Sequence, residues 1–328
     1  ESLFDKISEF LTEDKLEVLY WLGKIDFHNA LVKLEEEVMQ DLWVNEENAE
    51  DLWIDLWSIW EAVYKRVKKV MRKNVLKNSK RLDLRALDEV RKIKCETWLL
   101  PRVHGSWLFQ RWMTQVLSVT TLWGPDDVQI IDDMYDETTS RYIHHYNFPP
   151  FSVWEVRMLR WVGRREVWHG KLAEKALVPV LPTETEFPYM IRVVSETMTC
   201  NGSSSMASVC GSTLSLMQAW VPIKAPVAWI AMWMIYDEET WDYKILSDIQ
   251  AQEDFLWDMD FKVTMTPSWI TAMQLDVKIK GLSMEVFQKA FSQARVSINY
   301  ILEEMLKVQP SVAPSLSPYA PLIMNVFV

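Results

Sequence analysis

The strongest candidates for chemistry are carboxylates at the start of a short apolar run. If residues 258–264 form a strand, Asp258, Asp260 and Lys262 project from one face, because side chains of a strand alternate with period two. Asp254 lies in the loop just before it. Such carboxylates can hold a divalent cation through oxygen ligands, and the lysine could balance negative charge on a phosphoryl oxygen. Acidic loops are also common on protein surfaces, so a solvated loop is the alternative.

A second candidate is the small-residue segment 201–208, which is predicted to lie between a strand and a helix. Its hydroxyl side chains are Ser203, Ser204, Ser205 and Ser208. Free backbone N–H groups and the positive end of a helix dipole suit a phosphate or another anion. Serine is also a favoured N-cap, so an ordinary capped helix is the alternative.

A third candidate is a pair of adjacent arginines, Arg164 and Arg165, at the start of a predicted helix. Two cations are poorly placed for the helix dipole there, so another group should compensate them. Phosphate oxygens would do so, because guanidinium pairs well with them. His169 would lie about one turn after Arg165 on the same face, where it could contact the same anion.

The remaining polar candidates are interpreted as structural: Arg102, His104, His144 and His145. Three cysteines form no CxxC pair, which argues against a disulfide framework or a zinc site. We expect each to be a small buried apolar side chain: Cys95, Cys200 and Cys210.

The elements that must position these residues change in kind along the chain. Residues 2–78 follow the three-to-four spacing of helices, with helices expected at about 28–43 and 49–76. From residue 80 onward, segments with strand alternation are interleaved with helices. Strands and hairpins are predicted at 90–98, 107–122, 127–133 and 141–148, strands at 188–196, 226–236, 243–248, 258–264 and 270–280, and helices at 165–178, 203–219 and 283–308. This order predicts an α/β domain behind a helical appendage.

Composition limits the function classes. With 328 residues, 49% hydrophobic and 25% charged, the sequence is typical of a globular protein. It contains no apolar stretch long enough to span a bilayer, and we expect a cytoplasmic protein without a membrane partner. The net charge of −11 means that nucleic acid would have to be bound by local clusters of Arg and Lys.

Several segments together resemble the second catalytic core of polynucleotide phosphorylase (polyribonucleotide nucleotidyltransferase). Their order and spacing both agree with that family, from an Arg-Leu-Asp-Leu-Arg stretch at 81–85 to Ser-Pro-Tyr-Ala-Pro at 317–321. The segments that carry the resemblance are 100–106, 144–153, 164–173, 187–196, 201–210 and 258–263.

The resemblance implies a fold and a domain order. It implies an α/β (α+β) RNase-PH-like core with mixed sheets and packed helices, preceded by an all-α helical domain. Residues 1–79 would be the helical linker domain and 80–309 the catalytic core. Residues 310–328 would be a Pro/Ser-rich exit segment toward KH and S1 domains.

The resemblance also implies an activity. The family degrades RNA from the 3′ end with inorganic phosphate as co-substrate, releases nucleoside diphosphates, and can run the reaction backward. It works as a homotrimeric ring on single-stranded 3′ ends, sometimes within an RNA degradation complex, with Mg²⁺ or Mn²⁺. Carried over by motif, Asp254, Asp260 and Lys262 would be catalytic, and the two aspartates would bind the metal. The phosphate site would comprise Ser203, Ser204, Ser205, Arg164, Arg165 and His169.

The sequence departs from the family in its glycines. There are 18 tryptophans and only 8 glycines, whereas average usage of about 7% would give roughly 23. Tryptophan stands where the family pattern has glycine at Trp98, Trp112, Trp154, Trp168, Trp220, Trp229, Trp233, Trp257 and Trp269, and leucine does so at Leu84. If Trp168 and Trp257 crowd the catalytic motifs, the alternative is a catalytically silent ring subunit that binds RNA or scaffolds a degradation complex. A hydrolytic nuclease of related fold is a third option, which would not need the anion loop.

Overall fold

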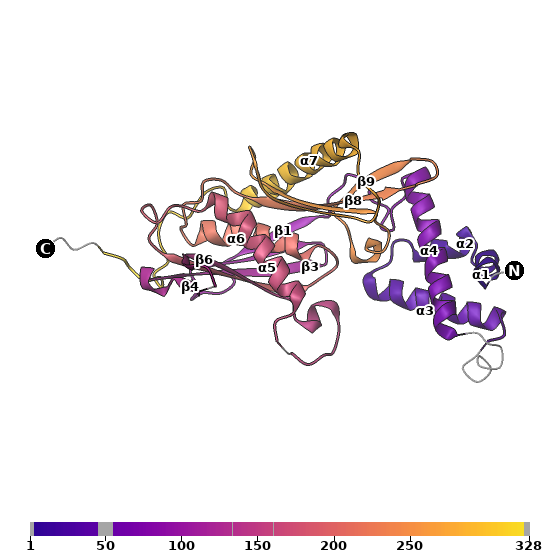
Figure 1. Cartoon of the computed structure of the whole chain (residues 1–328). Helices are drawn as coiled ribbons and strands as arrows, with labels where there is room; N and C mark the ends of the chain where they lie inside the picture. The colour runs from indigo at the N-terminus through magenta and orange to yellow at the C-terminus, as the bar shows by residue number, and fades with distance from the viewer. Residues whose placement is uncertain (1–2, 45–54, 133, 160, 325–328) are drawn as a thin grey trace. The chain divides into compact units, whose positions relative to one another are not determined.

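The structure is a computed structural model that describes residues 3–44, 55–132, 134–159 and 161–324 (Figure 1). The chain divides into two compact units, each assembled from more than one segment. The first unit comprises residues 1–89, 233–259 and 277–279, and the second comprises 90–232, 260–276 and 280–328. The predicted domain boundaries at residues 80 and 310 stay a prediction.

Helices make up the N-terminal part of the first unit, as the spacing of apolar residues predicts. They are α1 (Leu3–Phe10), α2 (Glu13–Leu16), α3 (Lys24–Asp41) and α4 (Leu56–Asn78). Ile7 of α1 and Ile59, Val63 and Val67 of α4 are buried at the three-to-four spacing that places them on one helix face. The predicted start of the third helix at residue 49 lies outside the described residues.

A five-stranded mixed sheet forms the frame of the second unit. Its strands are β1 (Ile93–Thr97), β2 (Gly105–Arg111), β3 (Thr114–Trp123), β6 (Tyr142–Asn147) and β7 (Met190–Thr199), in the order β1-β2-β3-β7-β6. Only the β6–β7 pair is parallel, with Tyr146 opposite Ser195. β3 alternates buried and half-buried residues along its length, which is the pattern of a strand with one face on the core.

Four further strands form a second sheet in the order β11-β10-β8-β9. They are β8 (Ala228–Tyr236), β9 (Tyr243–Ser247), β10 (Met259–Met265) and β11 (Ile270–Val277). A small hairpin of β4 (Gln129–Asp132) and β5 (Glu137–Ser140) stands apart from both sheets. The sequence predicted the first strand of this hairpin but not the second.

Three helices cover the strands of the second unit: α5 (Arg164–Leu177), α6 (Ser204–Gln218) and α7 (Met284–Val308). Every residue of α6 is buried, and the helix packs on β2 and β3. Small side chains permit this, since a Cβ on Gly211 would lie 2.8 Å from the Ser118 hydroxyl of β3. The middle of α6 therefore lies directly against β3, which positions the helix that begins with the serines.

Candidate active site

The serine segment begins with backbone that turns sharply into α6. Gly202 has φ of 85° and Ser203 has φ of 52°, both in the left-handed region, and Ser204 is the first helical residue. The Ser203 side chain makes no capping hydrogen bond to the helix. The predicted strand–loop–helix context of these residues is confirmed, and a serine, Ser203, occupies the N-cap position without making the side-chain hydrogen bond of an ordinary serine cap.

The two following serines are buried and take part in hydrogen bonds. Ser204 Oγ lies 2.7 Å from the Tyr146 hydroxyl, and the Cys200 thiol donates to it at 3.5 Å. The Ser205 carbonyl accepts a hydrogen bond from the Ser208 hydroxyl at 2.6 Å. Ser204 and Ser205 are each 2% exposed, so these residues are part of the packed start of the helix and do not form a solvated loop. An anion bound here would contact the start of the helix.

The arginine pair begins α5, as predicted. The start of this helix is capped from within the protein, because Glu166 Oε2 accepts from the Gly163 amide at 2.6 Å and Oε1 from the Phe148 amide at 2.8 Å. The Arg165 guanidinium lies over the Phe148 ring, 4.4 Å from its centroid. Arg164 and Arg165 are both exposed, so their charges remain accessible to a ligand.

Tyr146 links the arginine helix to the serine loop. The His169 ring packs edge-on against the Tyr146 ring, with 5.2 Å between centroids, while the Tyr146 hydroxyl contacts Ser204. Gly170 permits this approach, since a Cβ there would lie 3.1 Å from the His144 carbonyl of β6. Tyr146 itself is buried, and burial raises its pKa to about 12, so the hydroxyl keeps its proton.

His169 lies in a positive environment. Burial, followed by the positive charges of Arg165 and Lys262, lowers the pKa of His169 to about 3. The ring is therefore neutral at pH 7, and its buried Nδ1 has no hydrogen-bond partner among the described residues. A neutral imidazole with an unsatisfied nitrogen is suited to a hydrogen bond with a bound ligand.

Asp260 and Lys262 project from the same face of β10, as the period of a strand predicts. Lys262 Nζ lies 2.9 Å from Asp260 Oδ2, and Asp260 is 8% exposed. The influence of Lys262 on the pKa of His169 places its charge near α5. The second unit thus contains eight of the nine predicted residues, linked by contact or charge or as neighbours along the chain: Ser203, Ser204, Ser205, Arg164, Arg165, His169, Asp260 and Lys262. Arg164 lies next to Arg165 on α5.

The other acidic residues of this stretch belong to the first unit. Asp254 ends the 3₁₀ turn Ala251–Glu253, and its Oδ1 accepts from the Trp257 indole at 3.4 Å. Asp258 pairs with Arg72 at 2.6 Å and accepts from the Tyr236 amide at 2.8 Å, so it serves the fold. The pairing of Asp254 with Asp260 stays a prediction.

The residues interpreted as structural include two buried histidines. His104 Nδ1 accepts from the Leu122 amide at 2.7 Å, and His144 contacts Ser195 Oγ at 2.9 Å. Burial lowers the pKa of His144 to about 3. Both interpretations are confirmed.

The three cysteines are free thiols, and burial raises the pKa of Cys95 and Cys210 to about 12, which makes them unreactive.

Sequence reasoning missed three residues that shape this site: Tyr146, Arg91 and Arg111. Arg111 Nη2 donates to the Gly202 and Ser203 carbonyls at 2.8 and 3.2 Å, and Arg91 Nη1 donates to the Asn201 carbonyl. Both arginines are buried. Strand alternation could have placed Tyr146 on the buried face of its strand, but nothing in the sequence indicates which loop a buried arginine will bind.

A divalent metal would have few protein ligands here. The described residues contain no group of three or more His, Cys, Asp or Glu side chains that could hold one. Mg²⁺ is nevertheless usually bound through one or two carboxylates together with water and substrate phosphates. The carboxylates of Asp254 and Asp260 are the donor type that Mg²⁺ and Mn²⁺ prefer, so the donor set fits in kind.

Comparisons with known proteins decide the family. Residues 89–222 match the 3′ exoribonuclease family, domain 1, the RNase PH domain. The chain contains an RNase PH domain. It is 56% identical over 258 residues to a polyribonucleotide nucleotidyltransferase of Synechococcus sp. (strain JA-3-3Ab), and 54% identical over 268 residues to that of Gloeothece citriformis. These matches cover 79% and 81% of this chain, but only 36% and 37% of the relatives.

Solved structures support the same fold. A chain of the Archaeoglobus fulgidus exosome with RNA bound to the active site matches 73% of this chain and 98% of its own length, with a TM-score of 0.58 and 15% identity. Rice (Oryza sativa) Rrp46 matches 68% of this chain and 97% of its own length, with a TM-score of 0.54 and 13% identity. The predicted resemblance and the RNase-PH-like fold with mixed sheets behind an N-terminal helical region are therefore confirmed.

Proposed function

We propose that this protein is a phosphate-dependent 3′-to-5′ exoribonuclease that releases nucleoside diphosphates and can run the reaction backward. The chain spans about a third of the length of the polyribonucleotide nucleotidyltransferases that it matches, at 54–56% identity. The observation that carries the proposal is the convergence, in one compact unit, of a serine-lined helix start, a guanidinium and a neutral histidine beside an Asp–Lys pair.

The charges of this cluster suit a reaction between two anions. A phosphate oxygen would attack the terminal phosphodiester in line, the bond to the preceding 3′ oxygen would break, and that oxygen would take up a proton. Arg164, Arg165 and the amides at the start of α6 would hold the attacking phosphate against the repulsion of the substrate. His169 would add a neutral hydrogen bond to the phosphate.

Asp260 and Lys262 would act at the scissile phosphate. Lys262, held 2.9 Å from Asp260, would offset negative charge that develops on the phosphoryl oxygens. A Mg²⁺ or Mn²⁺ ion held by Asp254 and Asp260 would supply Lewis-acid stabilisation of the same charge. Inorganic phosphate is already anionic at neutral pH, so positioning and electrostatics would contribute more than a general base.

The wider setting follows from the family and is proposed on that ground. The substrate would be single-stranded 3′ ends of RNA, and the enzyme would work as a homotrimeric ring in the cytoplasm, including within an RNA degradation complex. Among the described residues, no helix is long and apolar enough to cross a membrane.

The test is an incubation of the full-length protein with an RNA that has an unstructured 3′ end and with Mg²⁺, with and without phosphate. Nucleoside diphosphates that form only with phosphate are expected. Nucleoside monophosphates formed without phosphate would indicate a hydrolytic nuclease instead. Binding of RNA without any product would indicate a silent subunit.

A further inference from the structure

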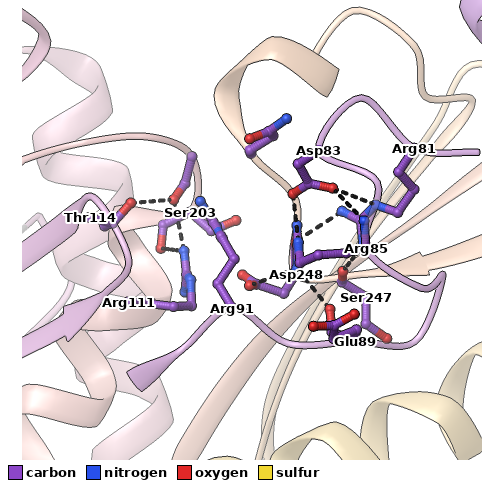
Figure 2. A network of polar contacts seen from close by, with 12 residues as sticks. Arg81, Asp83, Arg85, Glu89, Arg91, Arg111, Thr114, Ser203, Ser247 and Asp248 are labelled. Carbon is purple, nitrogen blue, oxygen red and sulfur yellow. Dashed lines mark hydrogen bonds and ion pairs between the residues drawn. The ribbon is translucent and has the colours of Figure 1, made fainter. Parts of the chain in front are cut away.

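Two buried arginines hold the backbone that leads into α6. Arg91 donates to the Asn201 carbonyl, and Arg111 donates to the carbonyls of Gly202 and Ser203 at 2.8 and 3.2 Å (Figure 2). Thr114 completes the arrangement, because its hydroxyl donates to the Gly202 carbonyl at 3.1 Å and accepts from the Asn201 amide at 3.0 Å. Three successive carbonyl oxygens are thus turned toward guanidinium groups.

The planarity of the peptide bond fixes where the amides then point. In a trans peptide the carbonyl of one residue and the N–H of the next point in opposite directions. With the carbonyls of 201–203 directed at the arginines, the amides of Gly202, Ser203 and Ser204 are directed away from them. Left-handed Ser203 followed by helical Ser204 is the backbone pattern of an anion-binding nest of successive N–H groups.

We infer that Arg111 and Arg91 are positioning residues for inorganic phosphate: they set the nest at 202–204 that binds it. This inference rests on the proposed function, because it assumes that the start of α6 receives the attacking phosphate. Neither arginine needs to touch the anion. Their role is to keep the three amides convergent while the loop is empty, so that phosphate binding does not have to order the loop.

The test compares R111K with R192K in the full-length enzyme. Lysine keeps the charge of Arg111 but not the forked contacts to two carbonyls. We expect the KM for phosphate to rise about tenfold in R111K, the KM for RNA to stay unchanged, and kcat at saturating phosphate to stay within about twofold. R192K is the matched control, because half-buried Arg192 contacts His145 and not the loop.

Two measurements separate the possible failures. Calorimetric titration with inorganic phosphate tests the nest even if the protein makes no product, so an inactive wild type would overturn only the proposed function. T114V is a second variant, which removes the contact to the Gly202 carbonyl and the acceptor of the Asn201 amide but leaves both arginines in place, and we expect a smaller loss of phosphate affinity. Unchanged phosphate affinity in folded R111K and T114V would overturn the inference, as would equal losses for phosphate and RNA.

A different observation concerns tryptophan. In the described part of the chain, eleven residues other than glycine have left-handed φ, and seven of them are tryptophans with φ between 50° and 67°. They are Trp21, Trp43, Trp98, Trp112, Trp154, Trp220 and Trp241. A bulky residue is rarely found in this region, whereas glycine adopts it at no steric cost.

The local structure around four of the seven is that of a glycine position. Trp43, Trp154 and Trp220 each lie just after a helical segment. In each case the amide of the residue that follows the tryptophan donates to the carbonyl of the residue five positions before that amide, at 2.9, 3.1 and 3.1 Å. This is the Schellman motif, in which the left-handed residue is usually glycine. Trp112 is the first residue of the two-residue loop between β2 and β3, where a positive φ again favours glycine.

Burial of these seven indole side chains contributes little stabilisation. All seven side chains are between 39% and 85% exposed, so burial does not offset the backbone strain. Two tryptophans with ordinary backbone, Trp107 and Trp229, are fully buried and leave their indole N–H without a partner among the described residues. Buried indoles usually find a partner, because an unpaired one destabilises the fold.

We infer that the seven left-handed tryptophans are glycines in the protein that the source cell makes. The cell would read one codon as glycine, whereas the printed sequence has that codon translated as tryptophan. UGA is such a codon, since it differs by one base from a tryptophan codon and from a glycine codon. Composition agrees, because the chain has 8 glycines where roughly 23 are expected from average usage, and 18 tryptophans.

Peptide mass spectrometry of the protein purified from its source cells tests this directly. Glycine is expected at all seven positions, and tryptophan at any of 43, 112, 154 or 220 overturns the inference. Recombinant protein translated with tryptophan gives a second test. We expect W43G, W154G and W220G each to raise Tm by a few degrees, while W57G, within helix α4, lowers it. A fall in Tm for all three left-handed positions would also contradict the inference.

Discussion

Both units contain clusters of arginines, but the groups that these arginines meet differ. In the first unit the guanidinium of Arg81 is fully buried and makes a forked pair with Glu253, at 3.0 and 2.7 Å. Arg85 pairs with Asp83 at 2.6 Å and with Asp248 at 3.3 Å (Figure 2). Each positive charge is matched by carboxylates, so this cluster joins chain segments and attracts no anion.

In the second unit the arginines near α6 serve a different purpose. Arg91 and Arg111 donate to backbone carbonyls, which orient a loop, and Arg165 lies exposed over an aromatic ring. A guanidinium that is solvent-accessible and not tied to a carboxylate in a fork is available to phosphate oxygens. The same residue type therefore stabilises the fold in one unit and prepares a binding site in the other. The difference lies in the acceptor that each guanidinium meets.

The largest expected effect is the loss of activity in D260N, a variant of the second unit. If Asp260 acts on the reacting groups through a metal or Lys262, losing its charge should lower kcat on the order of 10³-fold with the fold intact. Phosphate-dependent release of nucleoside diphosphates measures the rate, and Mn²⁺ binding followed by electron paramagnetic resonance measures the metal site. The control D276N changes an exposed aspartate of β11 and should leave the rate within about twofold. Less than a tenfold loss in D260N would remove Asp260 from the proposed machinery.

The opposite outcome is expected in the first unit. R81M leaves Glu253 buried without its forked partner, which should lower the free energy of unfolding by about 3–5 kcal/mol. Urea unfolding followed by circular dichroism measures this loss. K65M, which breaks the exposed pair with Glu61, should change stability by no more than about 0.5 kcal/mol. A loss below about 1 kcal/mol for R81M would mean that the two arginine clusters do not differ as described.

The contrast also shows how far the sequence leads. Periodicity predicted most of the strands and helices, because buried faces impose spacings of two and of three to four residues on β3, β10 and α5. It missed β5, whose Glu-Thr-Thr-Ser sequence is largely exposed and so carries no apolar alternation. The serine loop, the arginine pair and the Asp260–Lys262 face were predicted because each is a local pattern.

What the sequence could not predict is contact between distant segments. Arg111 is 91 residues away from Gly202, and Tyr146 is 58 residues away from Ser204. Such contacts depend on the pairing of β6 with β7 and on the close packing of α6 against the sheet. The role of Glu166 was missed for a different reason, since its capping bond is local but its second bond, to the Phe148 amide, requires α5 to lie beside the end of β6.

Within the second unit, R165Q should affect phosphate and not stability. Arg165 is exposed and its guanidinium lies over Phe148, so the fold should tolerate glutamine. Loss of a charged hydrogen bond to phosphate should raise the KM for phosphate about 10–100-fold. K171Q, at an exposed position on the same helix, serves as the control and should leave the KM unchanged. If R165Q lowers Tm markedly without changing the KM, Arg165 belongs with the structural arginines.

The smallest effect concerns the charge of His169. Because burial and the charges of Arg165 and Lys262 lower its pKa to about 3, the folded protein should keep the ring neutral from pH 8 to below pH 5. The unfolded chain takes up that proton near pH 6.5, so this histidine makes stability fall as pH decreases between about 6.5 and 3. H169Q should weaken that fall, and R165Q should raise the pKa of His169. Nuclear magnetic resonance titration of labelled histidine measures both. A midpoint for His169 between pH 5 and 8 would mean that the site is more hydrated than its contacts imply, and that a charged imidazolium, not a neutral ring, meets the phosphate.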